Sequence, residues 1–369
     1  HLIFVVKIKI NMKVCILGNG LSSLALAKTL ANQNIYVEII DEKKQKRTDQ
    51  SRTIGISKSN VNFFNNYIIN IDKIIWKLNR IEIFTDNLKK EKLLNFENNG
   101  DELFSIVRNI DLVKAIEKSL SKNVRFKKSY KKINLKSLEN YDLIINTDNL
   151  NIVTKKYFYK KIYKQYNSTA YTTIINHKEI KNNIATQIFT KKGPIAFLPI
   201  SNKQTSIVYS IHNSSKKKDD IINDLIHHYN FKYQIEKIEK ISSFNLKSFN
   251  LRSYYHDNIL AFGDLLHRIH PLAGQGFNMT IRDIKVLSDI IRNKLNLGLP
   301  LDISVNKEFE KKLRHNNFIF ANGIDLVHEF FNFERKTNIN IPSKVVQLFG
   351  KNLSINKIFT RIADKGIVF

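Results

Sequence analysis

The sequence predicts an α/β protein in which a central parallel sheet with helices is interleaved with an antiparallel sheet and followed by a helical C-terminal region. A strand, helix and strand follow one another between Lys13 and Asp41. Short apolar or alternating segments separated by Asn, Lys, Gly and Ser dominate from about Tyr163 to Phe244. The chain from about Leu301 onward is amphipathic and helical, with a break at Pro342.

Composition is typical of a soluble globular protein, with 43% hydrophobic and 25% charged residues in a chain of 369. The net charge of +27 would suggest an anionic partner. Lys, Asn and Ile are abundant everywhere, including the expected loops, so we attribute much of this charge to compositional bias. Runs such as Lys216 to Lys218 are interpreted as solvated surface. No nucleic-acid motif accompanies them, and we expect no nucleic-acid partner.

The single cysteine, Cys15, excludes an internal disulfide and a multi-cysteine metal site, which favours a reducing cytoplasm. The eleven residues before Met12 contain an apolar stretch too short to span a bilayer, and we interpret them as lying upstream of a start at Met12. No other segment has the roughly 18 to 20 continuous apolar residues that a membrane helix needs. Any membrane contact is expected to be peripheral.

The first motif is the glycine turn Gly18-Asn19-Gly20, which follows one expected strand and opens a helix. With Ser23 in the third small position, it matches a dinucleotide-binding fingerprint. The glycines allow a tight turn and a close approach of the backbone to a pyrophosphate at the helix N-terminus. Asp41 ends the next strand and can accept hydrogen bonds from ribose hydroxyls. The motif predicts nucleotide binding without separating FAD from NAD.

The second motif covers residues 263–278 and reads GDLLHRIHPLAGQGFN. Asp264 ends a strand, where its carboxylate can accept hydrogen bonds from a polyol chain. Pro271 stiffens the loop, and Gly274 and Gly276 let backbone amides approach a planar ring. A helix expected to start near Asn278 points its positive end at this loop and would stabilise negative charge there.

This segment closely resembles the second FAD motif of the class A flavin monooxygenases, and within them the ubiquinone-biosynthesis hydroxylase family. The resemblance covers most of Met12 to about Leu295. It implies FAD as cofactor, NAD(P)H as co-substrate, and hydroxylation of an aromatic ring by O2 through a flavin hydroperoxide. The flavin carries this chemistry, so no catalytic residue is assigned. The family's substrates imply a polyprenylated phenol, with contact to the inner membrane surface or to a biosynthetic complex.

The motifs and the resemblance together indicate a set of cofactor-binding residues: Gly18, Gly20, Ser23, Asp41, Arg52, Arg108, Asp264, Pro271, Gly274, Gln275, Gly276 and Asn278. Arg52 resembles an arginine that contacts the cofactor in the family, whereas Arg108 lies in the region of another contact and could also be a surface residue. The segment GPIAFLPI resembles the family's substrate-side strand. Its residues Phe197, Leu198 and Pro199 are interpreted as pocket wall or, with equal weight, as core.

The resemblance also implies the division of the chain. Residues 12–75, 106–160 and 251–300 form three parts of the FAD-binding domain. Residues 76–105 supply substrate-side strands, 161–250 form the substrate domain, and 301–369 form the helical region. This C-terminal region is expected either to cover the substrate domain or to lie on a membrane.

Three alternatives stay open from the sequence. His267 and His270 could serve acid-base catalysis or a metal, but the family uses no metal there, and we favour a structural role near the cofactor. A third motif reads Thr147-Asp148-Asn149, with Asn where the family usually has Gly, which leaves a catalytically degenerate scaffold possible. A prenyl reductase shares the fold, while a halogenase would need a tryptophan pair and the chain has only Trp76.

Overall fold

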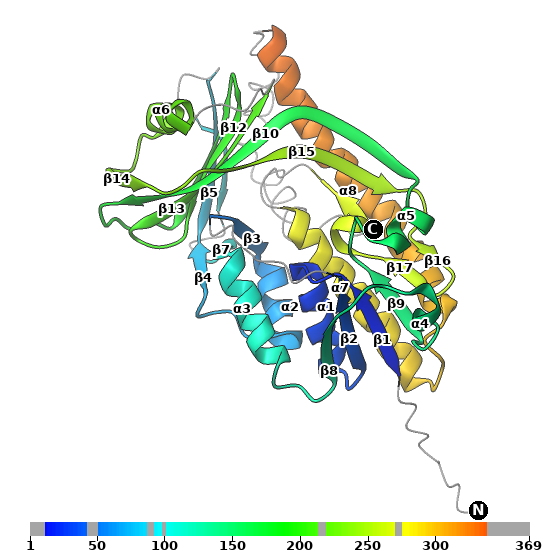
Figure 1. The fold of residues 1–369 in the computed structure, drawn as a ribbon. Helices are drawn as coiled ribbons and strands as arrows, with labels where there is room; N and C mark the ends of the chain where they lie inside the picture. The colour runs from blue at the N-terminus through cyan, green and yellow to red at the C-terminus, as the bar shows by residue number, and fades with distance from the viewer. Residues whose placement is uncertain are drawn as a thin grey trace, which may run out of the picture.

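The computed structural model describes residues 12–42, 51–86, 92–97, 101–212, 219–269 and 275–337. It confirms the α/β architecture: a six-stranded sheet with helices, a larger sheet beside it, and a long C-terminal helix (Figure 1). The larger sheet is antiparallel except for the pair β5–β11, which is parallel.

The first sheet has the strand order β16-β17-β9-β1-β2-β8. Its neighbours are parallel except for the β16–β17 hairpin. The strands are β1 (Lys13–Leu17), β2 (Tyr36–Asp41), β8 (Phe126–Tyr130), β9 (Leu143–Asn146), β16 (Tyr255–His256) and β17 (Ile259–Ala261). Strands β1 and β9 are almost wholly buried, as expected for the centre of a parallel sheet.

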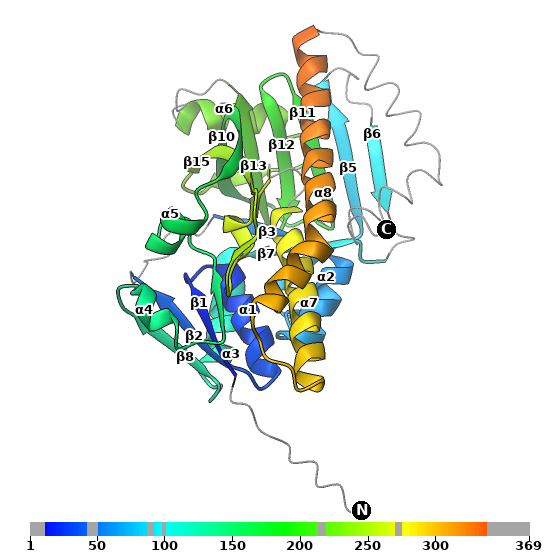
Figure 2. The ribbon, with the colours of Figure 1, turned by 90° about the vertical axis from the view of Figure 1, so that its right-hand side faces the viewer.

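Three helices pack together against this sheet and one another: α1 (Leu21–Asn32), α3 (Asn109–Leu120) and α7 (Gln275–Asn296). Helix α1 carries its buried side chains almost all round, because it is sandwiched between the sheet and its neighbours. Helix α2 (Lys58–Tyr67) adjoins α7, and α8 (Ile303–Thr337) packs along α7 (Figure 2). The expected break at Pro342 lies outside the described residues.

The second sheet has the order β18-β15-β10-β13-β12-β11-β5-β6, with β14 paired to β10. Its longest strand is β10 (Lys161–His177), which runs beside β15 (Ser242–Leu251). The other strands are β5 (Arg80–Thr85), β6 (Lys92–Glu97), β11 (Ile184–Thr190), β12 (Gly193–Pro199), β13 (Gln204–His212), β14 (Ile235–Ile238) and β18 (His267–Arg268). Helix α6 (Asp219–Tyr229) covers its outer face (Figure 1).

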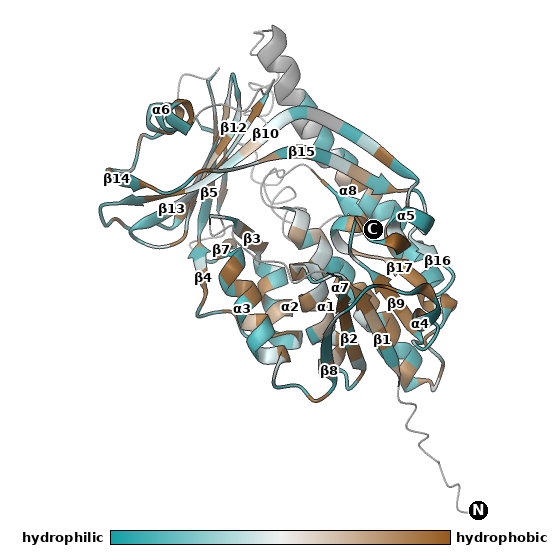
Figure 3. Cartoon of the chain, viewed as in Figure 1, coloured by the Kyte–Doolittle hydropathy of each residue, from teal (hydrophilic) through white to brown (hydrophobic). Residues whose placement is uncertain are grey.

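A small third sheet stands between the two large ones, with order β3-β7-β4. It contains β3 (Thr53–Ser57), β7 (Phe104–Arg108) and β4 (Ile75–Leu78). The remaining elements are short: α4 (Leu135–Leu138), α5 (Ile152–Tyr157) and the 3-10 turn η2 (Gly263–Leu265). The largest buried apolar cluster joins β1, β2, β9 and β17 to α1, α3 and α7, whereas a separate cluster lies between the second sheet and α6. Figure 3 shows the corresponding concentration of apolar residues in the first sheet.

None of the described helices is both long and apolar enough to cross a bilayer.

Candidate active site

The first glycine turn lies between β1 and α1. Gly18 has a φ of 103°, and a Cβ atom there would lie 2.6 Å from Thr147 Oγ1, so both backbone and space require glycine. Gly20 is the N-cap of α1, and a Cβ there would meet nothing within 4 Å in the described part of the chain. Among the described residues no side chain caps this helix. The open helix N-terminus is therefore suited to a pyrophosphate.

The third position of the turn joins the first motif to the third motif. Ser23 is buried, and its Oγ lies 2.7 Å from Thr147 Oγ1. Thr147 Oγ1 donates a hydrogen bond of 2.9 Å to Leu17 O, at the end of β1. Serine thus gives the close helix-strand packing expected of a small residue and adds a polar contact. Asp41 is buried at the carboxyl end of β2, next to this turn.

The second motif packs directly onto the first. Gly263 has a φ of 61°, and a Cβ atom there would lie 2.8 Å from Ser22 Cβ in the first turn of α1. Asp264, the next residue, is exposed. The strands preceding the three motifs, β1, β9 and β17, are neighbours and parallel, so all three motifs meet at the carboxyl edge of one sheet (Figure 1). Ligands of open α/β sheets bind at such an edge.

The third motif forms its turn without a left-handed residue. Asn149 is absent from the described residues with positive φ, so the turn does not need the glycine it replaces. Asp148 Oδ1 accepts a hydrogen bond from Leu150 N. The Asn149 side chain donates to Asp264 O at 3.4 Å and accepts from Lys161 Nζ at 3.0 Å. Asparagine therefore links the third motif to the second.

The helix of the second motif starts at Gln275, earlier than the expected start near Asn278. Among the described residues, a Cβ at Gly276 would have Ile269 Cγ1 as its nearest neighbour, at 4.0 Å. The Asn278 side chain is buried: it accepts from Ser57 N and Asn60 Nδ2 and donates to Gly55 O. That amide ties α7 to β3 and α2. His270, Pro271 and Gly274 lie outside the described residues.

Arg52 and Arg108 are brought together where β3 and β7 pair. Asn109 N donates to Arg52 O, and the Arg52 side chain is exposed. Arg108 donates to Gln204 Oε1 at 2.7 Å, at the start of β13. The side chain of Arg108 therefore reaches the second sheet in this structure, a contact that the sequence did not indicate.

Two hydroxyl pairs flank Arg52 and join the small sheet to the second sheet. Ser51 Oγ lies 3.0 Å from Thr172 Oγ1, and Thr53 Oγ1 lies 2.8 Å from Ser206 Oγ. These contacts identify the face of the second sheet that packs on the small sheet.

Phe197, Leu198 and Pro199 do not form one wall. Burial alternates along β12, because successive strand residues point to opposite faces. Phe197 packs in the cluster under α6 and stacks on Tyr233, with centroids 6.0 Å apart. Leu198 packs with β4, β5 and β7, and it is paired in register with Ser206. Phe197 is therefore a core residue, and a place for Leu198 in the substrate pocket stays a prediction.

His267 forms a buried structural contact. Its Nε2 lies 2.5 Å from Asp283 Oδ2, and both side chains are buried. Asp283 Oδ1 accepts from Asn317 Nδ2 at 3.2 Å. The three residues join β18 to α7 and α8, so the second motif is fixed to both long helices. Among the described residues, no cluster of three or more ligating side chains could hold a metal ion.

Known proteins resemble this chain in sequence and in fold. An FAD binding domain model matches residues 127–296. The ubiquinone biosynthesis monooxygenase COQ6 of Dictyostelium discoideum is 22% identical over 93% of this chain and 88% of its own length. The Drosophila melanogaster COQ6 is 21% identical over 78% and 71%. The chain is therefore similar to FAD-dependent monooxygenases of ubiquinone biosynthesis over most of its length.

Other similar proteins match different shares of this chain. The 3-demethoxyubiquinol 3-hydroxylase of Escherichia coli K12 is 28% identical, but the match spans only 39% of each chain. Among solved structures, p-nitrophenol 4-monooxygenase PnpA from Pseudomonas putida DLL-E4 has a TM-score of 0.77 at 11% identity, over 97% of this chain and all of that one. PqsL from Pseudomonas aeruginosa has a TM-score of 0.69 at 12% identity, over 92% and 99%. The structural likenesses establish the fold.

The cofactor of the monooxygenase is FAD, as expected from the sequence. The residues present fit it: the N-terminus of α1 is uncapped by any described side chain, Gly20 and Gly276 leave space, and Asp264 is exposed beside them.

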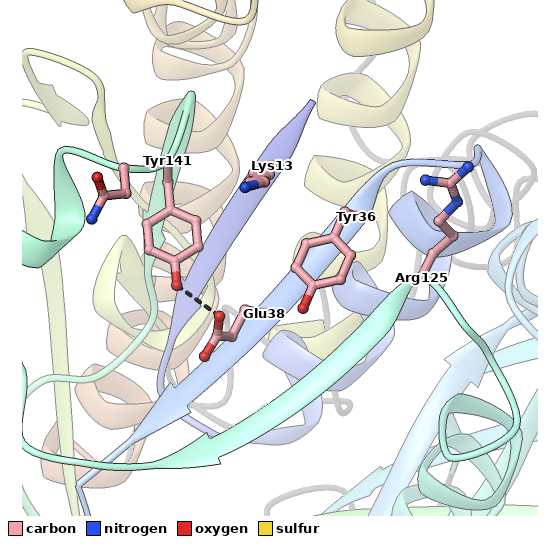
Figure 4. A pocket seen from close by; sticks show the side chains of 6 residues that line it. Lys13, Tyr36, Glu38, Arg125 and Tyr141 are labelled. Atoms are coloured by element: carbon pink, nitrogen blue, oxygen red, sulfur yellow. Dashed lines mark hydrogen bonds between the residues drawn. The ribbon is translucent and has the colours of Figure 1, made fainter. Parts of the chain in front are cut away.

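A separate cavity of about 420 Å³ lies at the other end of the first sheet (Figure 4). It is lined by Lys13, Tyr36, Glu38, Arg125, Asn140 and Tyr141. Most of these residues stand at or near the amino ends of their strands, away from the three motifs, so this cavity is not the FAD site. Glu38 lies at its centre and accepts from Tyr141 Oη and Ser129 Oγ, both at 2.7 Å.

We expect Gly20→Val to lose FAD while the protein stays folded, because the added side chain would fill space that no described atom occupies within 4 Å of a Cβ at this position and that the proposed cofactor would use. Flavin absorbance after purification and thermal unfolding of the apoprotein measure the two effects. Gly18→Ala is the contrasting variant, since its Cβ clashes with Thr147 and should lower stability as well. Yellow Gly20→Val protein with normal flavin content would contradict the site.

Gly263→Ala should destabilise the protein by about 1–3 kcal/mol, because it combines a left-handed backbone with a clash against Ser22. Adding Ser22→Gly should restore only the part of the stability that the clash removes, because the backbone strain at residue 263 remains. Chemical unfolding of the two single variants and the double variant measures this coupling. Strictly additive effects would show that the two motifs do not touch.

Asp283→Ala should cost about 3–5 kcal/mol, because it leaves His267 buried without its partner. Unfolding free energy is the measurement. Asp289→Ala, on the same helix but 41% exposed and paired only with Arg292, is the control and should change stability by less than about 1 kcal/mol. Equal losses in the two variants would argue against the buried contact.

Glu38→Gln should show a pH-dependent loss of stability. Burial alone would raise the pKa of Glu38, but hydrogen bonds from Ser129, Tyr141 and Lys131 lower it below its ordinary value of 4.5. The ionised carboxylate therefore stabilises the fold at neutral pH, and this contribution disappears as the pH falls through the folded-state pKa. The free energies of unfolding of Glu38→Gln and of the unmodified protein should therefore be similar in acid and differ increasingly toward neutral pH. A constant difference at every pH would contradict this assignment.

Proposed function

We propose that this monooxygenase hydroxylates the aromatic ring of a polyprenylated phenol in ubiquinone biosynthesis, using NAD(P)H and O2. The observation that carries the proposal is the contact between Gly263 and Ser22, which brings the second FAD motif onto the dinucleotide turn. The names of the sequence relatives supply the substrate class.

Each part of the site has a proposed role. The first turn of α1, with Gly18, Gly20 and Ser23, would hold the pyrophosphate, and Asp41 the adenosine ribose. Asp264 would accept hydrogen bonds from the ribityl chain. The N-terminus of α7, with Gln275, Gly276 and the backbone of Asn278, would lie at the pyrimidine edge of the ring. Arg52 and Arg108 would flank the cofactor from the β3–β7 junction, and Pro271 and Gly274 complete the proposed set.

When bound, FAD supplies the redox and oxygen-transfer chemistry. The protein must orient the substrate ring, exclude water and stabilise negative charge at the flavin. The positive N-terminus of α7 suits the last task, since its first turn contains no acidic residue. The face of the second sheet that contains Leu198, Ser206 and Thr172 contacts the small sheet and would adjoin the substrate.

The deciding experiment incubates the FAD-loaded protein with NADH or NADPH, a short-chain prenylated phenol and ¹⁸O2. We expect nicotinamide oxidation and a product containing one ¹⁸O atom. A product with a reduced prenyl double bond and no ¹⁸O would identify a prenyl reductase. Retained FAD without nicotinamide oxidation for any quinone precursor would favour a scaffold in a biosynthetic complex.

A further inference from the structure

Exposed apolar side chains gather in one short segment next to the third motif. Five large apolar or aromatic side chains there are between 48% and 78% exposed: Leu150, Ile152, Tyr159, Ile162 and Tyr163. The described part of the chain has fourteen exposed side chains of this kind, so more than a third fall within residues 150–163. Such a concentration marks an interaction site more often than chance exposure does. Residues 150–164 are called the α5 surface below.

Lysines accompany these apolar side chains. Residues 148–164 contain five lysines and one aspartate. Lys155, Lys156 and Lys160 are exposed, and the Nζ atoms of the latter two lie 5.0 and 5.7 Å from the rings of Tyr157 and Tyr159. Lys164 is neutralised by Asp325 and Glu329 on α8. Surfaces that lie in a membrane interface combine aromatic rings with lysines in this way.

The α5 surface stands at the periphery of the molecule, where β10 begins, and both views show α5 projecting from the body (Figures 1 and 2). It is also close to the proposed FAD site. Asn149 directly precedes it and contacts both the Asp264 backbone and Lys161.

The strand edge in this surface favours lipid over a strand from another protein. From Lys161 to Gln165, β10 pairs with β15, and its pairing with β13 begins only at Ser168. The other edge is therefore open in the described part of the chain. Lysines along such an edge disfavour the addition of a further strand. Ile162 and Tyr163 point to opposite faces, so apolar side chains flank the edge on both sides.

We propose that the α5 surface docks the protein on an anionic lipid surface. Its lysines meet the headgroups. Its leucine, isoleucine and tyrosine side chains enter the interface between headgroups and acyl chains. This inference goes beyond the proposed hydroxylation and does not depend on it. Docking through this surface would bring the third motif and the edge of the FAD site close to the bilayer.

The test measures co-sedimentation of the FAD-loaded protein with vesicles of phosphatidylethanolamine and phosphatidylglycerol, and with pure phosphatidylcholine vesicles. The variant combines Leu150→Ser, Ile152→Ser, Lys155→Glu and Lys156→Glu. We expect the unmodified protein to bind anionic vesicles more tightly than neutral ones, increasingly so at low salt. The variant should lose at least about tenfold in affinity for the anionic vesicles.

The matched control combines Ile221→Ser, Phe231→Ser, Lys237→Glu and Lys240→Glu, four exposed residues of the same types near α6, on the opposite side of the molecule (Figure 1). It carries the same change of charge and should bind vesicles nearly as well as the unmodified protein. Flavin content and thermal unfolding verify that both variants fold. The proposal is overturned if the unmodified protein binds no vesicles, if it binds neutral vesicles equally well, or if the α5-surface variant binds as tightly as the control.

Discussion

The arrangement of the three motifs depends on the close packing of Gly263 against Ser22. Neither turn alone encloses a dinucleotide: the first offers an open helix end, and the second offers an exposed aspartate. Because no side chain separates them, both turns reach the same edge of the sheet, where the proposed site would hold one extended cofactor. Thr147 completes the arrangement, since it contacts Ser23 and the end of β1 while its neighbour Asn149 reaches the second turn.

Local pattern was sufficient to predict the fold class and the first motif, whereas the second and third motifs were identified by resemblance to the family. The β–α–β unit, the helix Asn109–Leu120 and the strand-rich middle of the chain all follow from hydrophobic period and turn residues, and all are present. Contacts between distant segments could not be predicted in this way. Gln204 shows no signal in the sequence, yet it receives the Arg108 hydrogen bond. Asn278 looked like a cofactor ligand, but its amide is occupied by β3 and α2.

The substrate side shows why a motif alone misleads at the level of single residues. The segment GPIAFLPI was located correctly as a strand of the antiparallel sheet. A strand presents alternate residues to opposite faces, so three consecutive residues cannot share one wall. Only contacts with other elements show which face each residue occupies. Leu198 packs beside β4, and Phe197 packs beneath α6 on the other face. From the sequence, Asn149 was only a substitution for the glycine that the family usually has. In the structure its side chain links the third motif to the second.

The order of strands in the first sheet has a consequence for how the protein is made. Strand β1 emerges from the ribosome early, but its neighbour β9 is synthesised more than a hundred residues later, and β17 more than a hundred after that. Asn317, which completes the hydrogen bonding of Asp283, comes later still. The nascent chain must therefore carry an unfinished sheet, with buried strands exposed, through most of translation. At the proposed site, cofactor capture must follow synthesis of the second motif at residues 263–278, so the protein most needs protection from aggregation before that point.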